Sequence, residues 1–195
     1  MSMIYFLMGK SASGKNHIAE ALLEDKDLAL EPIVLYTTRP MRATEIDGHD
    51  YHFITDREEE AFMKAGKIIE ERVYNTVKGD WKYFTADDGT FDKLKEGKRL
   101  FVIGTLEAYE RYRDYFGEDR ICPIYIDVND ATLIERSVRR ENKQNDPDFE
   151  EVYRRFKADR SDFAPEKLAR INKLHRFTNN GNLEDCIRNI KEKIF

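Results

Sequence analysis

Apolar runs of strand length alternate along the chain with segments whose apolar residues have helical spacing. The first run, residues 3–8 (MIYFLM), ends at a glycine, and residues 15–24 (KNHIAEALLE) then place four apolar side chains on one helical face. A continuous apolar run of this length is typical of a strand that is buried on both faces of a parallel sheet. The pattern therefore predicts a strand, a glycine loop and a helix in succession.

Further buried strands are predicted over residues 32–37 (PIVLYT), 99–104 (RLFVIG), 121–128 (ICPIYIDV) and 175–179 (HRFTN). Helical stretches separate most of them. Strands that alternate with helices in this way predict an α/β fold, with a mainly parallel sheet as its core and helices on its flanks.

Two regions depart from this alternation. Residues 38–85 hold three short aromatic-rich segments and an acidic helix (DREEEAFMKAG), which indicates a small α+β insertion. In residues 139–156, two basic helical stretches flank a polar turn with Pro147, which indicates a mobile helical lid. We expect a single domain with its core at about 1–37, 86–135 and 161–195, the insertion at about 38–85, and the helical excursion at about 136–160.

The glycine loop after the first strand carries the first candidate chemistry. Residues 9–16 (GKSASGKN) complete the phosphate-loop pattern G-x-x-x-x-G-K in Gly9, Gly14 and Lys15. Backbone N–H groups of such a loop, together with the N-terminus of the following helix, form a cradle for phosphates, and the lysine adds a mobile cation. The predicted ATP-binding residues are Gly9, Lys10, Ser11, Ala12, Ser13, Gly14, Lys15 and Asn16.

Asn16 stands where the motif normally has Ser or Thr. Its amide oxygen can serve as a ligand of Mg²⁺, directly or through water, and it is therefore the candidate metal residue. The alternative is that Asn16 is only a tolerated residue of the first helical turn, with magnesium held by the nucleotide phosphates and waters.

Composition narrows the class of protein. The chain has 195 residues, 41% of them hydrophobic and 36% charged, and its formal net charge is -5, which argues against a general nucleic-acid binder. Cys122 and Cys186 are too few and too far apart for a disulfide framework or a zinc site. The N-terminal apolar run is too short to span a membrane, and no basic segment precedes it. We expect a cytoplasmic protein with neither a membrane nor a nucleic acid as partner.

A second phosphate site is suggested by residues 36–53 (YTTRPMRATEIDGHDYHF). Arg39 and Arg42 are three residues apart, near Glu45 and Tyr51, and two guanidinium groups are suited to a bidentate grip on a phosphate. The run is similar to the guanylate kinase signature, in which Thr-Thr-Arg is followed by a second Arg, a Glu and Gly-x-Asp-Tyr-x-Phe. Together with the glycine loop, it makes the whole chain resemble a guanylate kinase-like protein.

The resemblance implies a guanylate kinase that uses Mg²⁺ and transfers the γ-phosphoryl group of ATP to GMP. It places Arg39, Arg42, Glu45 and Tyr51 in the acceptor site, with Tyr83 as a further phosphate donor. It also implies that Glu70 accepts hydrogen bonds from the N1 and N2 edge of guanine, and that Thr85 donates to O6. The neighbouring Glu71 is an alternative reader of the base.

The resemblance also assigns the second departure to a lid. Arg136 and Arg140 are four residues apart on one helix, and Arg155 follows on the next, so a closing lid would bring these cations and Lys15 to the transferring phosphoryl group as the catalytic residues. Arg139 and Arg154 are weaker candidates. Asn179, after the last predicted strand, resembles a family contact to the donor adenine.

Three positions depart from the family pattern. Leu35 stands where a serine is usual, Phe84 replaces a typical glycine, and Gly104 lies where an acidic residue generally helps to bind guanine. Glu107 is a candidate to compensate. The alternatives are a related small-molecule kinase, with another nucleoside monophosphate or a ribose bisphosphate as acceptor, and a guanylate kinase-like interaction domain without catalysis.

Overall fold

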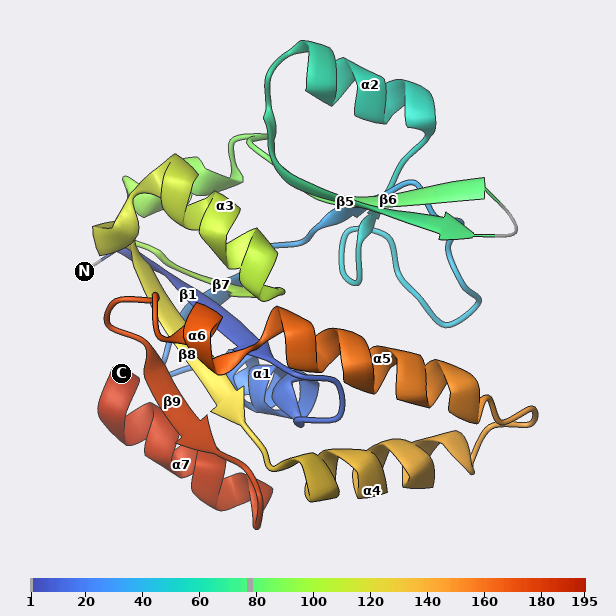
Figure 1. Cartoon of the computed structure of the whole chain (residues 1–195). Helices are drawn as coiled ribbons and strands as arrows, with labels where there is room; N and C mark the ends of the chain where they lie inside the picture. The colour runs from blue at the N-terminus through green and yellow to red at the C-terminus, as the bar shows by residue number, and fades with distance from the viewer. Residues whose placement is uncertain (1, 77–78) are drawn as a thin grey trace.

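A five-stranded parallel sheet forms the centre of the fold, in the order β2-β7-β1-β8-β9 (Figure 1). The computed structural model describes residues 2–76 and 79–195. This main sheet consists of β1 (Met3–Gly9), β2 (Leu30–Pro32), β7 (Arg99–Ile103), β8 (Ile121–Asp127) and β9 (His175–Thr178). The predicted strands at 3–8, 99–104, 121–128 and 175–179 all belong to it.

Helices cover both faces of the main sheet (Figure 1). Phe6 of β1 belongs to the core cluster that includes residues of α3 (Leu106–Phe116). Leu7 belongs to a second cluster with residues of α1 (Lys15–Glu24) and α7 (Leu183–Ile194). Successive side chains of a strand point to opposite faces, so an apolar strand such as β1 needs a cover on each side. The predicted α/β fold class is confirmed.

A helical hairpin projects from the main sheet (Figure 1). It runs over residues 130–162 and consists of α4 (Asp130–Glu141), a turn with Pro147, and α5 (Phe149–Asp162). The short helix α6 (Pro165–Leu168) follows it. Leu133 is the buried residue of α4, and α5 has none, so little apolar area ties the hairpin to the core. Elements with so few buried apolar contacts are the ones that open most easily.

A second, small sheet has the order β4-β3-β6-β5. Its strands are β3 (Tyr36–Thr37), β4 (His52–Phe53), β5 (Ile68–Thr76) and β6 (Gly79–Ala86). Helix α2 (Asp56–Lys64) begins at a capping box of Thr55 and Glu58, which satisfies backbone donors at its N-terminus. The aromatic segments predicted in residues 38–85 are strands of this sheet, and the acidic helix is α2.

The strand predicted over residues 32–37 is wrong as a single element. Its start belongs to β2 in the main sheet and its end to β3 in the small sheet, and residues 33–35 connect them without strand structure. Ile33 is buried in the main core, whereas Tyr36 packs in the cluster of the small sheet. The apolar run is continuous because the chain passes from one hydrophobic core directly into another.

The remaining two short helices are η1 (Thr90–Leu94) and η2 (Glu118–Arg120). Cys122 and Cys186 are buried free thiols of the same core cluster, and burial raises the pKa of Cys122 to about 11. Both act as small apolar residues. Among the helices of residues 2–76 and 79–195, none has the length and apolar character needed to cross a membrane.

Two carboxyl groups and one amine lie between α2 and the small sheet, and they are buried to different degrees. The side chain of Glu59 is fully buried and forms a short ion pair with Lys82 Nζ. One carboxylate oxygen of Glu59 and one of Glu71 are buried without a hydrogen-bond partner in the described part of the chain. Burial, and then the negative charge of Glu59, raise the pKa of Glu71. A single lysine thus faces two carboxyl groups.

The raised pKa of Glu71 makes the stability of the protein depend on pH. A carboxyl group whose pKa is higher in the folded state stabilises the fold fully at pH below its unfolded value of about 4.3, and this contribution is lost as pH rises through the folded value. We therefore expect Glu71→Gln to raise the thermal midpoint at pH 8 by a few degrees and to change it little at pH 4. Calorimetric unfolding scans of both proteins across this range measure the difference.

Glu60→Gln is the matched control, because Glu60 is an exposed carboxylate of α2 that pairs with Lys64. It should shift the midpoint only slightly at either pH. A Glu71→Gln protein that is equally or less stable at pH 8 would show that Lys82 neutralises both carboxylates.

Candidate functional site

The loop of residues 10–14 joins β1 to α1 at the carboxyl edge of the main sheet. Gly14, the N-cap of α1, has a φ of 86°, and Ala12 has a φ of 60°. Only glycine adopts the left-handed region at no steric cost. The turn leads into the N-terminus of α1, which has no side-chain cap, and the free backbone N–H groups of such a helix end favour an anion. We call residues 10–14 the phosphate loop.

Asn179 fixes the phosphate loop through a hydrogen bond to its backbone. Its side chain is buried after β9, and its Nδ2 donates a hydrogen bond of 2.8 Å to the backbone oxygen of Ser13. A Cβ at position 14 would lie 2.6 Å from this nitrogen, so the contact requires glycine there. The contact of Asn179 with a donor adenine stays a prediction, whereas its contact with the loop is part of the structure.

A cavity of about 540 Å³ opens beside the phosphate loop. Its lining is strongly cationic and includes residues of the loop, of α1 and of the helical hairpin. The cations are Lys15, Arg136, Arg139, Arg140, Lys143 and Arg155. The predicted lid arginines and the loop lysine therefore meet in one place, and Asn16 and Asn179 line the same cavity. We call it the loop cavity.

Burial and two neighbouring charges shift the pKa of Lys15. Burial of its ammonium group lowers the pKa of Lys15, and the positive charge of Arg140 acts in the same direction, whereas the carboxylate of Asp159 opposes both. The side chain of Lys15 donates to the backbone oxygen of Lys10 at 3.4 Å. A cation that is partly removed from water interacts more strongly with an incoming anion.

Asp159 occupies part of the phosphate cradle. It lies on α5, and its Oδ2 accepts a hydrogen bond of 2.6 Å from the backbone N–H of Ser11. A second contact between loop and hairpin joins Lys10 Nζ to Asp130 Oδ1 at 3.1 Å. Within α5, Glu151 accepts from Arg154 and Arg155, and these bonds lower the pKa of Glu151 to about 2. The hairpin thus supplies both the arginines and their counter-charges.

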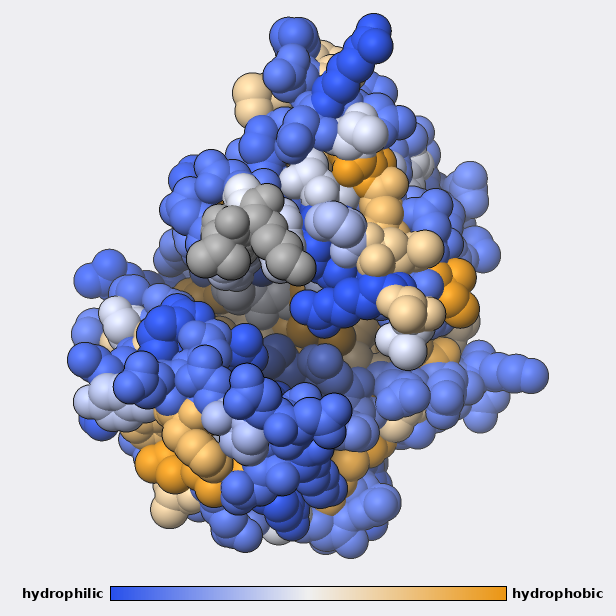
Figure 2. All heavy atoms as spheres, turned by 90° about the vertical axis from the view of Figure 1, so that its right-hand side faces the viewer, coloured by the Kyte–Doolittle hydropathy of each residue, from blue (hydrophilic) through white to orange (hydrophobic). Residues whose placement is uncertain are grey.

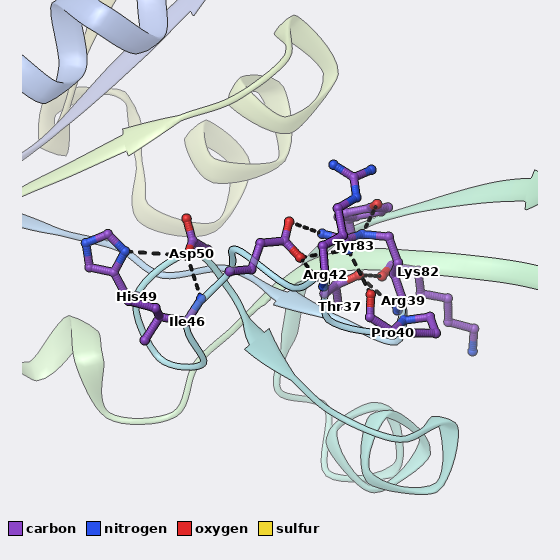
Figure 3. A network of polar contacts seen from close by, with 10 residues as sticks. Thr37, Arg39, Pro40, Arg42, Ile46, His49, Asp50, Lys82 and Tyr83 are labelled. Carbon is purple, nitrogen blue, oxygen red and sulfur yellow. Dashed lines mark hydrogen bonds and ion pairs between the residues drawn. The ribbon is translucent and has the colours of Figure 1, made fainter. Parts of the chain in front are cut away.

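A second polar cluster lies around Arg39, at the edge of the small sheet (Figure 3). The Arg39 guanidinium pairs with both carboxylate oxygens of Glu45, at 2.7 and 2.9 Å, and its Nε donates to the Tyr83 hydroxyl at 3.0 Å. It also lies over the rings of Tyr51 and Phe53. Hydrogen bonds, first of all those from Arg39, lower the pKa of Glu45 to about 2.

The predicted acceptor-phosphate residues differ in their exposure. Arg39 is 4% exposed and is largely committed to Glu45, so it is built into the site as a support. Arg42 is exposed, and its backbone N–H also donates to Glu45. Burial is the main cause that raises the pKa of Tyr51. The geometry leaves Arg42 as the more accessible of the two arginines. Their contact with an acceptor phosphate stays a prediction.

Glu70 is the buried acid of the small sheet. Its Oε1 accepts a hydrogen bond of 3.0 Å from Thr85, whose hydroxyl in turn accepts one of 3.0 Å from Tyr112. Its Oε2 accepts from Arg72 Nε at 3.2 Å. Burial raises the pKa of Glu70, and the charge of Arg72 opposes this shift. In this arrangement the hydroxyl hydrogen of Thr85 is directed to Glu70. A bond from Thr85 to a base oxygen stays a prediction.

The alternation of strand residues separates Glu70 from Glu71. Glu70 pairs with Thr85 across β5 and β6, and Glu71 pairs with Phe84, so the two acids lie on opposite faces. We call the face with Glu70, Arg72, Tyr83 and Thr85 the acceptor face. Glu71 lies on the other face, near Glu59. Phe84 is fully buried there and stacks on Tyr36, so its departure from the family pattern concerns the core.

The other two departures also lie in packed surroundings. Leu35 is a partly buried member of the main core. A Cβ at Gly104 would overlap the ring of Phe6, which leaves no room for the acidic side chain that is usual in the family.

A hollow separates the part of the molecule with the small sheet from the part with the helical hairpin. Figure 2 shows it between the upper and lower parts of the molecule, with hydrophilic residues along much of its rim. The phosphate loop and the acceptor face belong to these two parts.

Arg72, Asp159 and Lys143 also belong to these sites, although no sequence motif marks them. Arg72 follows Glu70 by two residues in a strand, and Asp159 follows Arg155 by four residues in a helix. Both spacings place the residues on one face of their element, which was a usable signal. Lys143 lies in the turn beyond α4, where sequence spacing gives no direction.

The sequence is similar to those of guanylate kinases. A family model described as guanylate kinase matches residues 1–83. Guanylate kinase 2 (chloroplastic/mitochondrial) of Oryza sativa subsp. japonica is 24% identical over 194 residues, which cover 98% of this chain and 63% of that protein. The guanylate kinase of Novosphingobium aromaticivorans is 37% identical over 114 residues, 56% of this chain and 49% of that protein. The chain thus spans about half to two thirds of the length of these two relatives.

Two further relatives match along nearly the whole chain. The guanylate kinase of Mesomycoplasma hyopneumoniae is 24% identical over 200 residues, which cover 100% of this chain and 94% of that protein. The crystal structure of guanylate kinase from Anaplasma phagocytophilum has a TM-score of 0.66 at 20% identity, and the match covers 98% of this chain and 83% of the other. This structural match concerns the fold.

The fold and the loop define a P-loop protein of the α/β class, with a phosphate loop at the carboxyl edge of a parallel sheet and a cationic hairpin beside it. The sequence matches are more specific. They make the chain similar to guanylate kinases along most of its length and support a guanylate kinase-like family.

The contact of Asp159 with the phosphate loop leads to a test. The Asp159 carboxylate accepts a hydrogen bond from the N–H of Ser11, so a phosphate bound in the predicted loop would compete with it for this donor, and the two negative charges would repel each other. We expect Asp159→Asn to strengthen the binding of ATP by about fivefold, which corresponds to roughly 1 kcal/mol. Isothermal titration of both proteins with ATP measures the change.

Asp162→Asn is the control, because it removes an exposed carboxylate from the end of the same helix. ATP should bind to that variant as it does to the wild type. Weaker ATP binding by Asp159→Asn would mean that the carboxylate serves to orient Lys15 and not to compete with phosphate.

Proposed function

We propose that the chain is a guanylate kinase that transfers the γ-phosphoryl group of ATP to GMP and forms ADP and GDP. The observation that carries the proposal is the meeting of Lys15 with the hairpin arginines in the loop cavity. The small sheet supplies a second polar site with Arg42 and Glu70. Two phosphate sites that face each other are what a transfer between two nucleotides requires.

In the proposed reaction no side chain forms a covalent bond. An oxygen of the acceptor phosphate bonds to the γ-phosphorus of ATP, while the bond from that phosphorus to the β,γ-bridging oxygen breaks and its electron pair remains with ADP. The protein stabilises the charge on the transferring group with Lys15, Arg136, Arg140 and Arg155. Closing of the hairpin would exclude water from the site.

Magnesium is the expected cofactor. Asn16 is exposed and lines the loop cavity, whose lining contains no carboxylate among the described residues. Within the same described residues, no group of three or more His, Cys, Asp or Glu side chains could form a metal site. These residues fit an ion that is held mainly by nucleotide phosphates and waters, with Asn16 as a further oxygen ligand. When bound, magnesium neutralises phosphate charge.

An assay of ADP release tests the proposal. We expect turnover with ATP and GMP, slower turnover with dGMP and IMP, and little with AMP, CMP, UMP or ribose 1,5-bisphosphate. Lys15→Ala should lower the rate by about a hundredfold or more, because Lys15 stabilises charge that develops in the transition state.

Lys26→Ala provides the control for this variant, since Lys26 is an exposed lysine beyond the far end of α1. It should retain the wild-type rate. An unchanged rate in Lys15→Ala would rule out the kinase mechanism, and a faster reaction with another acceptor than with GMP would correct the substrate.

The amide of Asn16 leads to a separate prediction. Replacement by Thr restores the hydroxyl of the usual motif and should lower the magnesium concentration that gives the half-maximal rate, whereas Asn16→Leu should raise it because leucine has no oxygen ligand. Titration of the rate with magnesium at fixed ATP measures both effects, and calorimetric titration with the magnesium–ATP complex measures binding directly. Equal magnesium dependence in all three proteins would show that Asn16 has no contact with the ion.

A further inference from the structure

The acceptor face carries a pair of opposite charges of which only one member is accessible. Glu70 and Arg72 are two residues apart on β5, and their side chains therefore lie on the same face of the small sheet. The Glu70 side chain is 2% exposed and that of Arg72 is 19% exposed. A ligand that approaches this pair meets the guanidinium first.

The hydroxyl groups beside the pair have no hydrogen left to donate. The hydroxyl of Tyr112 donates to Thr85, and the hydroxyl of Thr85 donates to Glu70. Each hydroxyl has a single hydrogen, and both hydrogens are used within the chain that ends on the carboxylate. Thr85 therefore orients Glu70 and supplies no donor to a ligand unless this chain is broken.

Arg72 retains donors. A guanidinium has five N–H groups, and the two contacts with Glu70, from Nε at 3.2 Å and from Nη2 at 3.5 Å, engage two of them. The Arg72 guanidinium has no other hydrogen bond with the described part of the chain. The pair thus presents an acceptor, the carboxylate, next to an accessible donor, the guanidinium.

We propose that Arg72 is a specificity-determining residue of the acceptor site, which donates to the carbonyl oxygen of an oxopurine base while Glu70 accepts from the neighbouring ring N–H. This inference rests on the proposed function and adds a residue to it. Guanine and hypoxanthine present a carbonyl acceptor next to a ring N–H donor. Adenine presents an amino donor next to a ring acceptor. Its amino group would face the donor Arg72, and its ring nitrogen would face the acceptor Glu70, so neither could form a hydrogen bond.

The packing around the pair supports a fixed reading geometry. Arg72 is opposite Tyr83 in the strand register, and Tyr83 accepts a hydrogen bond from the buried Arg39. Glu70 is held by Thr85 and, through it, by Tyr112 of α3, which is 1% exposed. A donor and an acceptor held by strand register and buried hydrogen bonds lose little entropy when a base binds.

Arg72→Gln is the variant of choice. Removal of the whole side chain would leave Glu70 as an unpaired buried charge and endanger the fold, whereas glutamine can still donate to it. We expect the dissociation constants for GMP and IMP to rise by about tenfold or more, because a hydrogen bond from a charged donor is lost. AMP binding should be unchanged or tighter, since the amide oxygen can accept from the adenine amino group.

The experiment is a calorimetric titration of the full chain with GMP, IMP and AMP in the absence of ATP. Arg57→Gln is the matched control: it makes the same change at an exposed arginine of α2, and its binding should equal that of the wild type. The melting temperature of each protein is recorded to confirm the fold.

Two results would overturn the inference. One is a ratio of GMP affinity to AMP affinity that is the same in Arg72→Gln as in the wild type, or a wild type that shows no preference for GMP over AMP. The other is a loss of affinity for GMP but not for IMP. IMP lacks the N2 amino group, which only Glu70 would contact, so this result would mean that Arg72 serves only as a support for Glu70. A wild type that prefers GMP over AMP but transfers no phosphoryl group would refute the proposed function and leave the inference intact.

Discussion

The left-handed turn at Gly14, packed against the amide of Asn179, is the constraint on which the rest of the site depends. It fixes the phosphate loop after β1 to the segment after β9, two strands away in the main sheet. The carboxyl ends of parallel strands lie at one edge, so the first and last parts of the chain meet there. Any side chain at position 14 would push the loop away from Asn179 and alter the direction of the N–H groups that form the cradle.

The phosphate loop favours anions, and the helical hairpin places several positively charged side chains beside it. Five cations of the hairpin and Lys15 line the loop cavity. Without bound phosphate their repulsion is relieved by carboxylates of the hairpin itself, with Glu151 on Arg154 and Arg155, and Asp159 on Ser11 and near Lys15. The bonds of Glu151 lie within α5, so the polar contacts that join the hairpin to the phosphate loop are those of Asp159 with Ser11 and of Asp130 with Lys10. Since α5 buries no residue in the core, such polar contacts are important for the position of the hairpin.

Much of the fold could be predicted from the sequence, because the main-sheet strands are continuous apolar runs with helices between them. The strand over 32–37 was predicted wrongly because hydrophobicity does not show that Ile33 and Tyr36 belong to different cores. In the site, the motif spacing located the loop and the arginines that line its cavity. It could not show that Arg39 would be buried on Glu45, that Thr85 would direct its hydrogen to Glu70, or that Asp159 would bind the loop. These contacts join residues whose side-chain directions depend on tertiary packing.

The missing carboxylate at Gly104 and the polar chain beneath Glu70 follow from the same packing. Phe6 fills the space that a side chain at position 104 would need, and its ring packs edge to face against Tyr112 at 5.1 Å. Tyr112, fixed in this way, donates to Thr85, and Thr85 donates to Glu70. The aromatic core therefore leaves no space for an acidic side chain at position 104, and it orients the carboxylate of Glu70. With a single buried carboxylate, one guanidinium suffices to balance the charge, and Arg72, two residues along the same strand, is in the position to provide it.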